Sequence, residues 1–582
     1  MTKSANGKIW QQKHINEHYV SELRSRLGIS DLLAKILSSR ALSLELAFSF
    51  LSSKIKHLLP DPFHLLDMDK AVNRTIEAIL KQEKIYIFAD YDVDGATSSA
   101  LLKNIFRDLD KNVDIYVPDR IEEGYGPTEY SFQKIKDSGA ELVITVDCGT
   151  SSYQALKYAK KIGLDVIVID HHISIDIPPE PVAIVNPNRI DETSDYTYLA
   201  AVGVAFLFAT ALLSSLKKQL GYTKTLPNLM QYLDLVAIGT VCDVMPITNL
   251  NRAFVTQGLK VMKQRLNIGI KTLCDMAGIE EKLNCYHLGF VLGPRINAGG
   301  RVGKSSLGAN LLSSLLQSEA SELSSELEKH NNERKVIELI MIDEAMSIAE
   351  NQNDQKLLFI VGDRWHAGVI GIIAGKLKEK FNKPVAVIAL VDGIGKASCR
   401  SIKGIDFGAK IIEAKNQELI LTGGGHAMAA GFTVAENKLP ELQQFLYTLF
   451  ENDFKSFPPH EIEEYEEELT TSSINLDFMD ELATLEPFGN GNPDPIFKFS
   501  NLFVLKADVI AGKHIRCLLA PSKDAFGSKA ISAIVFNVVP GSIEKILMNP
   551  KPSRINVLGS LKINFWKEQK RIQLQIKDVF IA

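Results

Sequence analysis

The feature that most constrains this chain is a series of short apolar runs that end in polar, mostly acidic residues. Five such runs lie between residues 84 and 188: KIYIFAD, VDIYVPD, LVITVDCG, DVIVIDHH and VAIVNPN. Amphipathic stretches of helical period separate the first four. Short apolar runs are typical of buried strands, and strands joined by helical crossovers form a parallel sheet with both faces covered. We therefore predict an α/β domain built on a parallel sheet.

Carboxylates collect where these predicted strands end. Ligand sites in such sheets lie beyond the carboxyl ends of the strands. One aspartate at a strand end is commonly a helix N-cap. Several on one edge repel each other unless protons or cations neutralise them, so the pattern predicts a metal centre. The acids and imidazoles at these ends are Asp90, Asp92, Asp94, Asp119, Asp147, Asp170, His171 and His172.

The run DYDVDG also fits the opening of a calcium-binding EF-hand loop. That loop needs a bidentate glutamate at its twelfth position, and here the twelfth residue is Leu101. Hard oxygen ligands with one or two imidazoles suit Mn²⁺ or Mg²⁺ better than zinc. Two such ions, bridged by a carboxylate, activate a water and stabilise both oxygens of a phosphoryl displacement. The residue set therefore indicates hydrolysis of a phosphodiester or phosphoanhydride.

With 582 residues the chain is too long for a single hydrophobic core. We predict a helical N-terminal extension over 1–75 and the first α/β domain over 76–310. A long, solvated linker helix is expected over 311–352, a second α/β domain over 353–455 and a small OB-like β-barrel over 456–582.

Charge and cysteine usage limit the class of protein. The net charge of −5 gives no global attraction to nucleic acid, so any such binding needs local basic patches. The six cysteines form no CxxC pair, which is typical of reduced, cytoplasmic proteins. No apolar run near the N-terminus suggests a signal peptide.

One uncharged stretch, Thr197 to Leu216, is long enough to span a bilayer. Asp170 precedes it and Asp243 follows it, and we expect both at one site. A membrane-spanning helix would place them on opposite sides of the membrane. We therefore predict that this helix is buried and that the protein does not enter a membrane.

The predicted C-terminal barrel has a locally basic stretch with two aromatic residues inside it. Phe565 and Trp566 either stack on bases, as in OB-folds that hold single strands, or fill the core of a solvated strand face. The acidic run Glu461–Glu468 is expected to be a solvated face. The cations of the basic stretch are Lys551, Arg554, Lys562, Lys567, Lys570, Arg571 and Lys577.

Taken in order, several motifs resemble one known group of enzymes. DYDVDG, VDCG, DHH and GTVCDVMP resemble the four motifs of the DHH phosphoesterase superfamily, and GGGHAMAAGF is similar to its DHHA1 domain. VPDRIEEGYG, GPRINAGGR, WHAGVIGIIAGKL, SCRS and LEPFGNGNP narrow the resemblance to the RecJ family of bacterial single-stranded-DNA exonucleases. It extends from about residue 80 to the C-terminus.

The resemblance implies a role for each residue of the predicted metal centre. Asp147 would bridge the two ions, and Asp90 would be an additional ligand or an acid that orients the others. His172 would face the scissile phosphate, while Asp170 would hold the imidazoles in their working tautomer. The implied metal ligands are Asp92, Asp94, Asp147, His171 and Asp243.

The resemblance also implies a set of DNA contacts. Arg120, Ser398 and Arg400 would bind the 5′-terminal phosphate, and guanidinium and hydroxyl donors suit that group. Arg295 and Arg301 would contact the DNA backbone from a Gly-rich loop. GGGHAMAAGF would be a Gly-rich loop leading into a helix, where His426 holds the nucleotide being removed. Taken singly, these residues also fit surface cations, caps and tight turns.

The implied function is a 5′-to-3′ exonuclease of DNA repair and recombination. It would degrade single-stranded DNA to mononucleotides with two Mn²⁺ or Mg²⁺ ions, as a monomer that works with a helicase and a single-stranded-DNA-binding protein. A DHH/DHHA1 oligoribonucleotide phosphatase or cyclic-dinucleotide phosphodiesterase is the alternative, against which the extra β-domain counts. A non-catalytic DNA-binding scaffold has no physical need for so costly an acid cluster.

Overall fold

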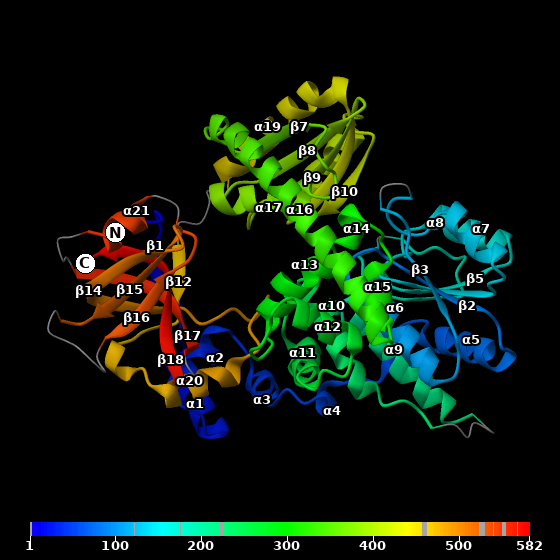
Figure 1. The fold of residues 1–582 in the computed structure, drawn as a ribbon, viewed down its shortest axis with the longest axis horizontal. Helices are drawn as coiled ribbons and strands as arrows, with labels where there is room; N and C mark the ends of the chain where they lie inside the picture. The colour runs from blue at the N-terminus through cyan, green and yellow to red at the C-terminus, as the bar shows by residue number, and fades with distance from the viewer. Residues whose placement is uncertain are drawn as a thin grey trace. The chain divides into compact units, whose positions relative to one another are not determined.

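The computed structural model describes residues 3–120, 123–174, 176–219, 225–456, 462–522, 530–538, 541–549, 554–566 and 569–582. The chain divides into two compact units. Unit 1 comprises Met1–Pro60, Val244–Gln257 and His460–Ala582, and unit 2 comprises Asp61–Asp243 and Gly258–Pro459. Figure 1 traces the elements of both units.

Unit 2 begins with a five-stranded parallel sheet in the order β3-β2-β4-β5-β6 (Figure 1). Every residue of β4 is buried, because helices cover both faces. Helices α7 and α8 pack on one face, and α6 and α9 contact β4 on the other. The predicted parallel sheet is confirmed. Its elements are β2 (Ile85–Ala89), α6 (Val93–Asp108), β3 (Asp114–Tyr116), α7 (Glu129–Asp137), β4 (Leu142–Val146), α8 (Tyr153–Lys161), β5 (Asp165–Ile169), β6 (Ala183–Val185) and α9 (Ala201–Leu216), preceded by α5 (Met68–Lys81).

The uncharged stretch forms α9, which is buried along nearly all of its length. It contacts α5, α6 and α10 (Leu233–Cys242) as well as the sheet. Among the residues that the structure describes, no helix combines the length and the apolarity needed to cross a membrane. The prediction of a buried helix is confirmed.

A helical layer follows, and it corrects one prediction. GPRINAGGR is not a Gly-rich loop, because the chain is helical in α13 (Gly293–Ile296) and α14 (Gly299–Val302). A Cβ on Gly300 would lie 2.7 Å from the carbonyl oxygen of Tyr91, so this glycine serves close packing. The other elements of the layer are α12 (Ile268–Met276), the π-helix η3 (His287–Leu292) and α15 (Leu307–Ser313); α11 (Asn249–Met262) begins in unit 1 and enters unit 2 at Gly258.

The predicted linker helix is α16 (Gln317–Asn351), which joins the two α/β parts of unit 2. The prediction that it is solvated throughout is wrong, because one stripe of α16 is buried. Ala320 and Leu327 lie on that stripe near the start, and Ala345 and Ala349 near the end. The helix packs on α12 and α15 at one end and on β7 and α17 at the other. It therefore contributes to the cores that it connects.

The second α/β part has a five-stranded sheet in the order β10-β11-β9-β8-β7, in which only β7 and β8 are parallel. GGGHAMAAGF does not lead into a helix as predicted. It forms a β-hairpin, because each strand pairs along its full length with its neighbour. The elements are β7 (Leu358–Asp363), α17 (Ile370–Phe381), β8 (Val385–Val391), β9 (Ile394–Arg400), α18 (Phe407–Asn416), β10 (Thr422–His426), β11 (Ala429–Ala435) and α19 (Leu439–Ser456).

Unit 1 contains the predicted β-barrel. Strand β14 pairs with both β15 and β17, which closes the sheet β14-β15-β16-β18-β17. Closure removes the exposed edges that an open sheet would carry. The elements are β13 (Glu467–Glu468), α20 (Leu476–Leu482), β14 (Phe497–Ile510), β15 (His514–Ala520), β16 (Ile531–Val535), α21 (Ser542–Leu547), β17 (Arg554–Trp566) and β18 (Gln569–Ile581).

The N-terminal segment belongs to the same unit. It contains the expected helices, and it also begins with a strand that the sequence reasoning missed. Residues from α1, α2 and α3 share one hydrophobic core with the barrel, including Leu23, Leu37 and Phe50. The elements are β1 (Ile9–Gln12), α1 (Glu17–Leu27), α2 (Asp31–Ser39), α3 (Leu44–Ser52) and α4 (Ile55–Leu58).

The acidic run is not a solvated face. It forms β12 (Ile462–Tyr465), which pairs in parallel with β1, and continues into β13. Glu466 is buried, pairs with Lys13 at 2.7 Å and accepts a hydrogen bond from Ser39. Glu467 pairs with Lys35 at 2.9 Å. Cations from distant segments neutralise these acids. Glu461 lies outside the described residues.

Candidate active site

Six of the predicted site residues converge at the carboxyl edge of the parallel sheet, and Asp243 joins them from the C-terminus of α10. Three overlapping groups offer ligand atoms that lie within 4.8 Å of one another. The groups are Asp90, Asp92 and Asp147; Asp147, His171 and His172; and Asp94, His171 and Asp243.

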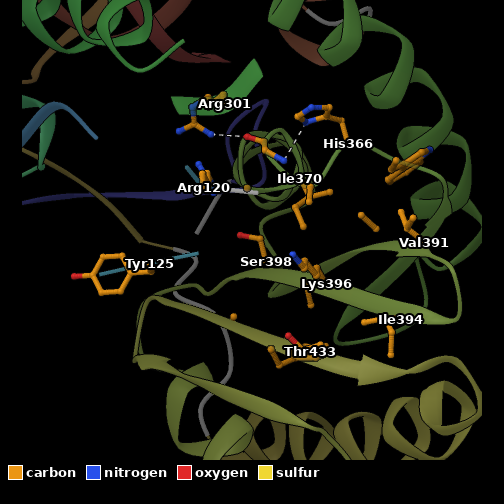
Figure 2. Close-up of a pocket in the computed structure, with 18 of the residues that line it drawn as sticks. Arg120, Tyr125, Arg301, His366, Ile370, Val391, Ile394, Lys396, Ser398 and Thr433 are labelled. Carbon is orange, nitrogen blue, oxygen red and sulfur yellow. Dashed lines mark hydrogen bonds between the residues drawn. The ribbon is translucent and has the colours of Figure 1, made fainter. Parts of the chain in front are cut away.

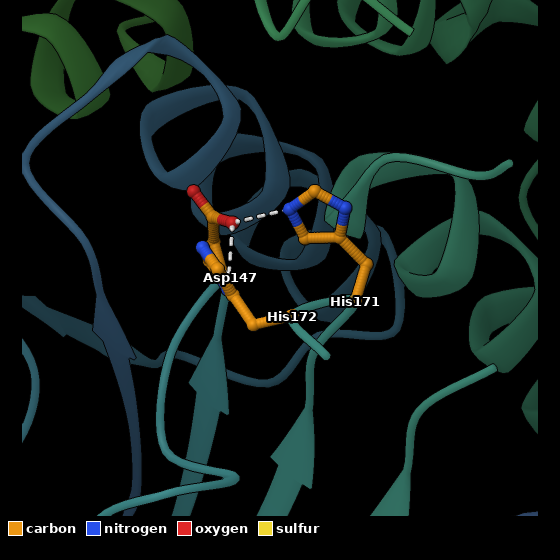
Figure 3. A group of neighbouring side chains, drawn as sticks. All are labelled: Asp147, His171 and His172. Carbon is orange, nitrogen blue, oxygen red and sulfur yellow. Dashed lines mark ion pairs between the residues drawn. The ribbon is translucent and has the colours of Figure 1, made fainter. Parts of the chain in front are cut away.

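His171 lies at the centre of this cluster. Its Nε2 is 3.3 Å from Asp147 Oδ1, 3.6 Å from Asp243 Oδ2 and 4.0 Å from Asp94 Oδ2. His172 Nδ1 lies 4.0 Å from the same oxygen of Asp147 (Figure 3). Asp147 therefore belongs to two of the three groups and faces both imidazoles.

The start of α6 fixes two of the acids. Asp92 is the N-cap of this helix and accepts hydrogen bonds from the backbone N–H groups of Asp94 and Gly95. Asp94 is fully buried and accepts from the backbone N–H groups of Ala201 and Val202, at the start of α9. An acid at a helix N-terminus is electrostatically favourable, so α9 orients Asp94.

Asp147 has a strained backbone. Its φ is +61°, in the left-handed region that few residues other than glycine adopt. Such strain is maintained only where the surrounding structure holds it, and it concentrates at functional sites.

Asp170 orients the imidazole of His172 and belongs to none of the three groups of potential metal ligands. It accepts hydrogen bonds from His172 Nδ1 at 2.7 Å and from the backbone N–H groups of His171 and His172. The Thr150 hydroxyl donates to its other oxygen at 2.7 Å. Burial alone would raise the pKa of Asp170, but these partners hold that pKa well below its usual range. Asp170 is therefore an anion that fixes the neighbouring imidazole.

The two histidines differ in charge. Burial and the neighbouring His172 lower the pKa of His171 to about 4, so His171 is neutral at physiological pH. Burial would also lower the pKa of His172, but its hydrogen bond to Asp170 raises it to about 9. A neutral imidazole can bind a metal, whereas an imidazolium can only donate protons or stabilise negative charge.

The remaining carboxylates repel one another more than their partners offset. Burial and repulsion from Asp92 raise the pKa of Asp94 to about 7, and burial and repulsion from Asp94 raise that of Asp243 to about 9. Among the described residues, Asp90 Oδ1, Asp147 Oδ1 and Asp243 Oδ2 are buried without a hydrogen-bond partner. Unpartnered buried oxygens beside a neutral imidazole are the donor set of a hard divalent cation, so the site fits such a metal.

A cavity of about 980 Å³ lies within unit 2 (Figure 2), and Tyr91, the residue between Asp90 and Asp92 in the sequence, is part of its lining. Its lining includes five cationic side chains and the N-terminal turn of α17, which has no side-chain cap. No aspartate or glutamate is among the described residues that line it. Cations and free helix N–H groups favour an anion. The cationic side chains are Arg120, Arg301, Arg364, Lys396 and Arg400.

Four of the six predicted DNA-binding residues line this cavity: Arg120, Arg301, Ser398 and Arg400. Arg400 donates to Ser398 Oγ at 3.3 Å, and a Cβ on Gly371 would lie 3.1 Å from that oxygen. Glycine at this position therefore lets α17 approach the pair closely. Arg301 donates to the carbonyl of Gly368 at 2.7 Å.

The structure places the other two predicted residues away from the cavity lining. Arg295 pairs with Glu328 of α16 at 2.6 Å. His426 is exposed on β10, and its ring accepts from the backbone N–H of Met428. Both lie within motifs whose backbone differs from the predicted loops.

Sequence reasoning missed Tyr125, which connects the cavity to the acid cluster. It lines the cavity, donates to the backbone carbonyl of Asp147 at 3.2 Å and lies 3.3 Å from the His172 ring nitrogens. His366, another lining residue, was also missed. Both lie in quoted motifs, VPDRIEEGYG and WHAGVIGIIAGKL, but no spacing rule singles them out.

The basic stretch of the barrel is partly neutralised. Lys562 pairs with Asp494, and Lys577 pairs with Glu463. Arg554 lies over the ring of Phe503. Whether Phe565 and Trp566 stack on bases or fill the core stays open, because their side chains lie outside the described part of the structure, as do Lys551 and Lys567.

Comparison with known proteins gives three family matches along the chain. The DHH family, N-terminal domain, matches residues 84–240, the DHHA1 domain matches 353–452 and the RecJ OB domain matches 465–578. A structure of RecJ from Thermus thermophilus in complex with Mn²⁺ is similar, with a TM-score of 0.81 and 25% identity over 98% of this chain and 79% of that chain. Another RecJ structure, bound to manganese, has a TM-score of 0.57 and 30% identity over 69% of this chain and 97% of that one.

Two relatives are similar over nearly their full length. Single-stranded-DNA-specific exonuclease RecJ from Escherichia coli (strain K12) is 34% identical over 91% of this chain and 93% of its own length. The protein of the same name from Haemophilus influenzae is 34% identical over 90% of this chain and 92% of its own length. With this identity and coverage, the chain belongs to the RecJ family of single-stranded-DNA-specific exonucleases.

Proposed function

We propose that this protein is a Mn²⁺- or Mg²⁺-dependent 5′-to-3′ exonuclease that degrades single-stranded DNA to mononucleotides in DNA repair and recombination. The observation that carries the proposal is the cluster around His171 and Asp147, with its unpartnered carboxylate oxygens, together with a cationic cavity that Tyr125 connects to Asp147. Relatives named as single-stranded-DNA-specific exonucleases support the substrate, and related structures with Mn²⁺ and Mg²⁺ support the metals.

Two ions would be held by Asp92, Asp94, Asp147, His171 and Asp243, with Asp90 as a further ligand or an orienting acid. Such ions activate water and stabilise the charge that develops on a phosphate. The protonated His172, held by Asp170, would donate to an oxygen of the scissile phosphate. Tyr125, in contact with the His172 ring, would limit the movement of that imidazole.

Polarity would come from the cavity. A terminal phosphate bound by Arg120, Ser398 and Arg400 lies at a fixed distance from the acid cluster, and that distance determines which bond is cut. Arg301 also lines this cavity. Arg295 and His426 stay predictions as contacts to the strand and the released nucleotide, and the barrel over 456–582 as a module that grips single strands.

The decisive assay is digestion of single-stranded DNA labelled at one end or the other, with and without a 5′-phosphate, in Mn²⁺. Mononucleotides released from the 5′ end would support the proposal. Short oligoribonucleotides and a cyclic dinucleotide serve as competing substrates in the same assay. Faster turnover of either one, with long DNA left intact, would instead support the phosphatase or phosphodiesterase alternative.

We also propose that the protein acts in the cytoplasm as a monomer, beside a helicase and a single-stranded-DNA-binding protein. A helicase would supply the single strand that this cavity can admit. Light scattering of the purified protein tests the monomer, and a rate increase on duplex DNA when a helicase is added tests the coupling.

A further inference from the structure

The cavity of unit 2 is larger and more cationic than a single terminal phosphate requires. Its volume is about 980 Å³, and five cationic side chains line it without an acidic one among the described residues. A phosphate monoester carries about two negative charges. The proposed function already gives that phosphate Arg120, Ser398 and Arg400, so Arg364 and Lys396 have no part in it.

Lys396 extends the predicted phosphate site along β9. Side chains alternate along a strand, so Lys396, Ser398 and Arg400 share the face that lines the cavity, with about 7 Å between one and the next. Tyr125 marks the side of the cavity that contacts the acid cluster, through its hydrogen bond to Asp147. In Figure 2, Ser398 lies between Tyr125 and Lys396. Lys396 is therefore on the side of Ser398 that faces away from the acid cluster.

Two hydroxyl groups lie in one row with Lys396 across the sheet. Thr433 of β11 is its register partner, and Thr422 of β10 is the partner of Thr433. All three residues line the cavity. In the next row on this face, Ser398 pairs with Gly431, which has no side chain to fill the space beside the serine hydroxyl. An ammonium group and hydroxyl groups in one row are a donor set for an anion.

A second cation, Arg364, lies across β8 from Lys396. Lys396 pairs in register with Ala389, and the N–H of Arg364 donates to the carbonyl of Leu390, the next residue, at 2.8 Å. The φ of Arg364 is +54°, and such strain concentrates at functional sites. Both cations are exposed to the cavity, and neither forms an ion pair with another described residue. Two uncompensated charges therefore lie at the same end of the cavity.

We propose that Arg364, Lys396 and Thr433 form a second anion subsite, which binds the further phosphates of a strand whose 5′ end is a di- or triphosphate. Phosphates in an anhydride follow one another through a single bridging oxygen. A triphosphate whose first phosphate lies at Ser398 and Arg400 therefore extends along β9 toward Lys396. The inference rests on the proposed function, in which the terminal phosphate binds at this pair. It extends the substrates to strands that have kept the triphosphate of their first nucleotide.

The reaction at such an end is still the hydrolysis of one phosphodiester bond. Water adds to the phosphorus between the first and second nucleotides, the bond from that phosphorus to the 3′ oxygen breaks, and the 3′ oxygen takes a proton. The anhydride bonds stay intact. The first product is therefore a nucleoside triphosphate, and the shortened strand carries a 5′-monophosphate, which is degraded as before.

The test uses the full-length protein and three DNA strands of one sequence that differ only at the 5′ end, which is a hydroxyl, a monophosphate or a triphosphate. They are digested in excess Mn²⁺ by the wild type, by Lys396→Met and by Arg364→Asn. Methionine keeps the length of the lysine side chain without its charge, and asparagine tolerates the left-handed backbone at Arg364. The matched control is Lys415→Met, the same substitution at an exposed lysine of α18, which packs on the other face of the sheet.

We expect the wild type to cleave the triphosphate end as readily as the monophosphate end and to release a nucleoside triphosphate, identified by chromatography. In Lys396→Met and Arg364→Asn, the ratio of kcat/KM on the triphosphate end to that on the monophosphate end should fall about tenfold, as for the loss of a hydrogen bond between charged groups. Lys415→Met should leave this ratio unchanged.

Binding gives a second measurement that does not depend on catalysis. The inactive Asp147→Asn protein, alone and combined with Lys396→Met or Arg364→Asn, binds the same strands, labelled at the 3′ end, in fluorescence anisotropy without metal. The triphosphate strand should bind more tightly than the monophosphate strand, and this advantage should be lost in the combined variants.

Three results would overturn the second subsite: equal affinity for the two phosphorylated strands in Asp147→Asn, an unchanged rate ratio in both variants, or pyrophosphate instead of a nucleoside triphosphate as the first product. A wild type that degrades the monophosphate strand and leaves the triphosphate strand intact would overturn it as well. Failure of the proposed function is seen separately, because the wild type would then leave the monophosphate strand intact too, while the anisotropy measurement still decides whether the subsite exists.

Discussion

Asp147→Asn should abolish hydrolysis and, in the presence of a chelator, stabilise the protein. The carboxylate is buried among other acids, and burial together with repulsion from Asp92 raises its pKa well above the usual range. Asparagine has nearly the same shape and tolerates the left-handed backbone at this position. The substitution therefore removes one charge from a repulsive cluster without opening a cavity. Solubility and binding of single-stranded DNA should be retained.

The gain can be bounded from the geometry. Asp147 shares a group with Asp90 and Asp92 whose ligand atoms lie within 4.8 Å of one another. At that distance, with an effective dielectric constant near 20, one pair of carboxylates repels by about 3 kcal/mol. Protons held by the cluster and the imidazolium of His172 offset part of this repulsion. We therefore expect a net gain of about 1–3 kcal/mol, which for a unit of this size raises the melting temperature by about 1–4 °C.

The assay is calorimetry at pH 8, in chelator and in saturating Mn²⁺, on the wild type, Asp147→Asn and Asp170→Asn. Asp170→Asn is the matched control, because it makes the same substitution at the next strand on an acid with five hydrogen-bond donors. It should lose about 2–4 kcal/mol, since hydrogen bonds to a buried charge are strong.

Mn²⁺ should make the melting temperature of the wild type higher than that of Asp147→Asn, the reverse of the order expected in chelator. It should raise the melting temperature of the wild type and have much less effect on Asp147→Asn, because ligand binding stabilises only a state with an intact site. If Asp147→Asn were destabilised in chelator as much as Asp170→Asn, the argument that the acids repel one another would be refuted.

Three further predictions follow from other contacts. The pKa values of Asp94 and Asp243 are raised in the folded protein, to about 7 and about 9, so in chelator the stability from their bound protons is lost as the pH rises from about 4 through 9. Mn²⁺ binds the deprotonated ligands and should reverse this slope, and melting curves across that pH range with and without Mn²⁺ check both expectations. Arg400→Ala should slow cleavage of the first nucleotide by about tenfold or more on 5′-phosphorylated DNA and have little effect on 5′-hydroxyl DNA, and equal slowing on both would exclude a phosphate contact. Arg252→Lys should lower the stability of unit 1 by about 2–4 kcal/mol, because an ammonium cannot reach the four carbonyls of residues 484–487 that the guanidinium contacts. Urea unfolding measures this loss, and an unchanged midpoint would contradict the stabilising role of Arg252.

Local patterns in the sequence were enough to predict the main elements and the chemistry at their ends. Alternation of apolar runs with amphipathic stretches predicted the parallel sheet, and its strand ends predicted the acid cluster, because all carboxyl ends of a parallel sheet lie on one edge. The uncharged stretch over α9 was predicted as a buried helix because Asp170 and Asp243 had to meet. These inferences depend on local periodicity and on one topological rule, both of which a single sequence contains.

Which distant segments meet could be read only from the folded chain. The acids of β12 and β13 looked solvated, yet Lys13 and Lys35 neutralise Glu466 and Glu467 across more than 400 positions of sequence. Tyr125 reached the His172 ring only through the fold. Likewise GGGHAMAAGF became a hairpin because β9 offered it a partner strand. The local sequence determines which residues an element can bury and whether it can pair as a strand. The partner that it meets depends on contacts between segments hundreds of residues apart, and no local pattern predicts such contacts.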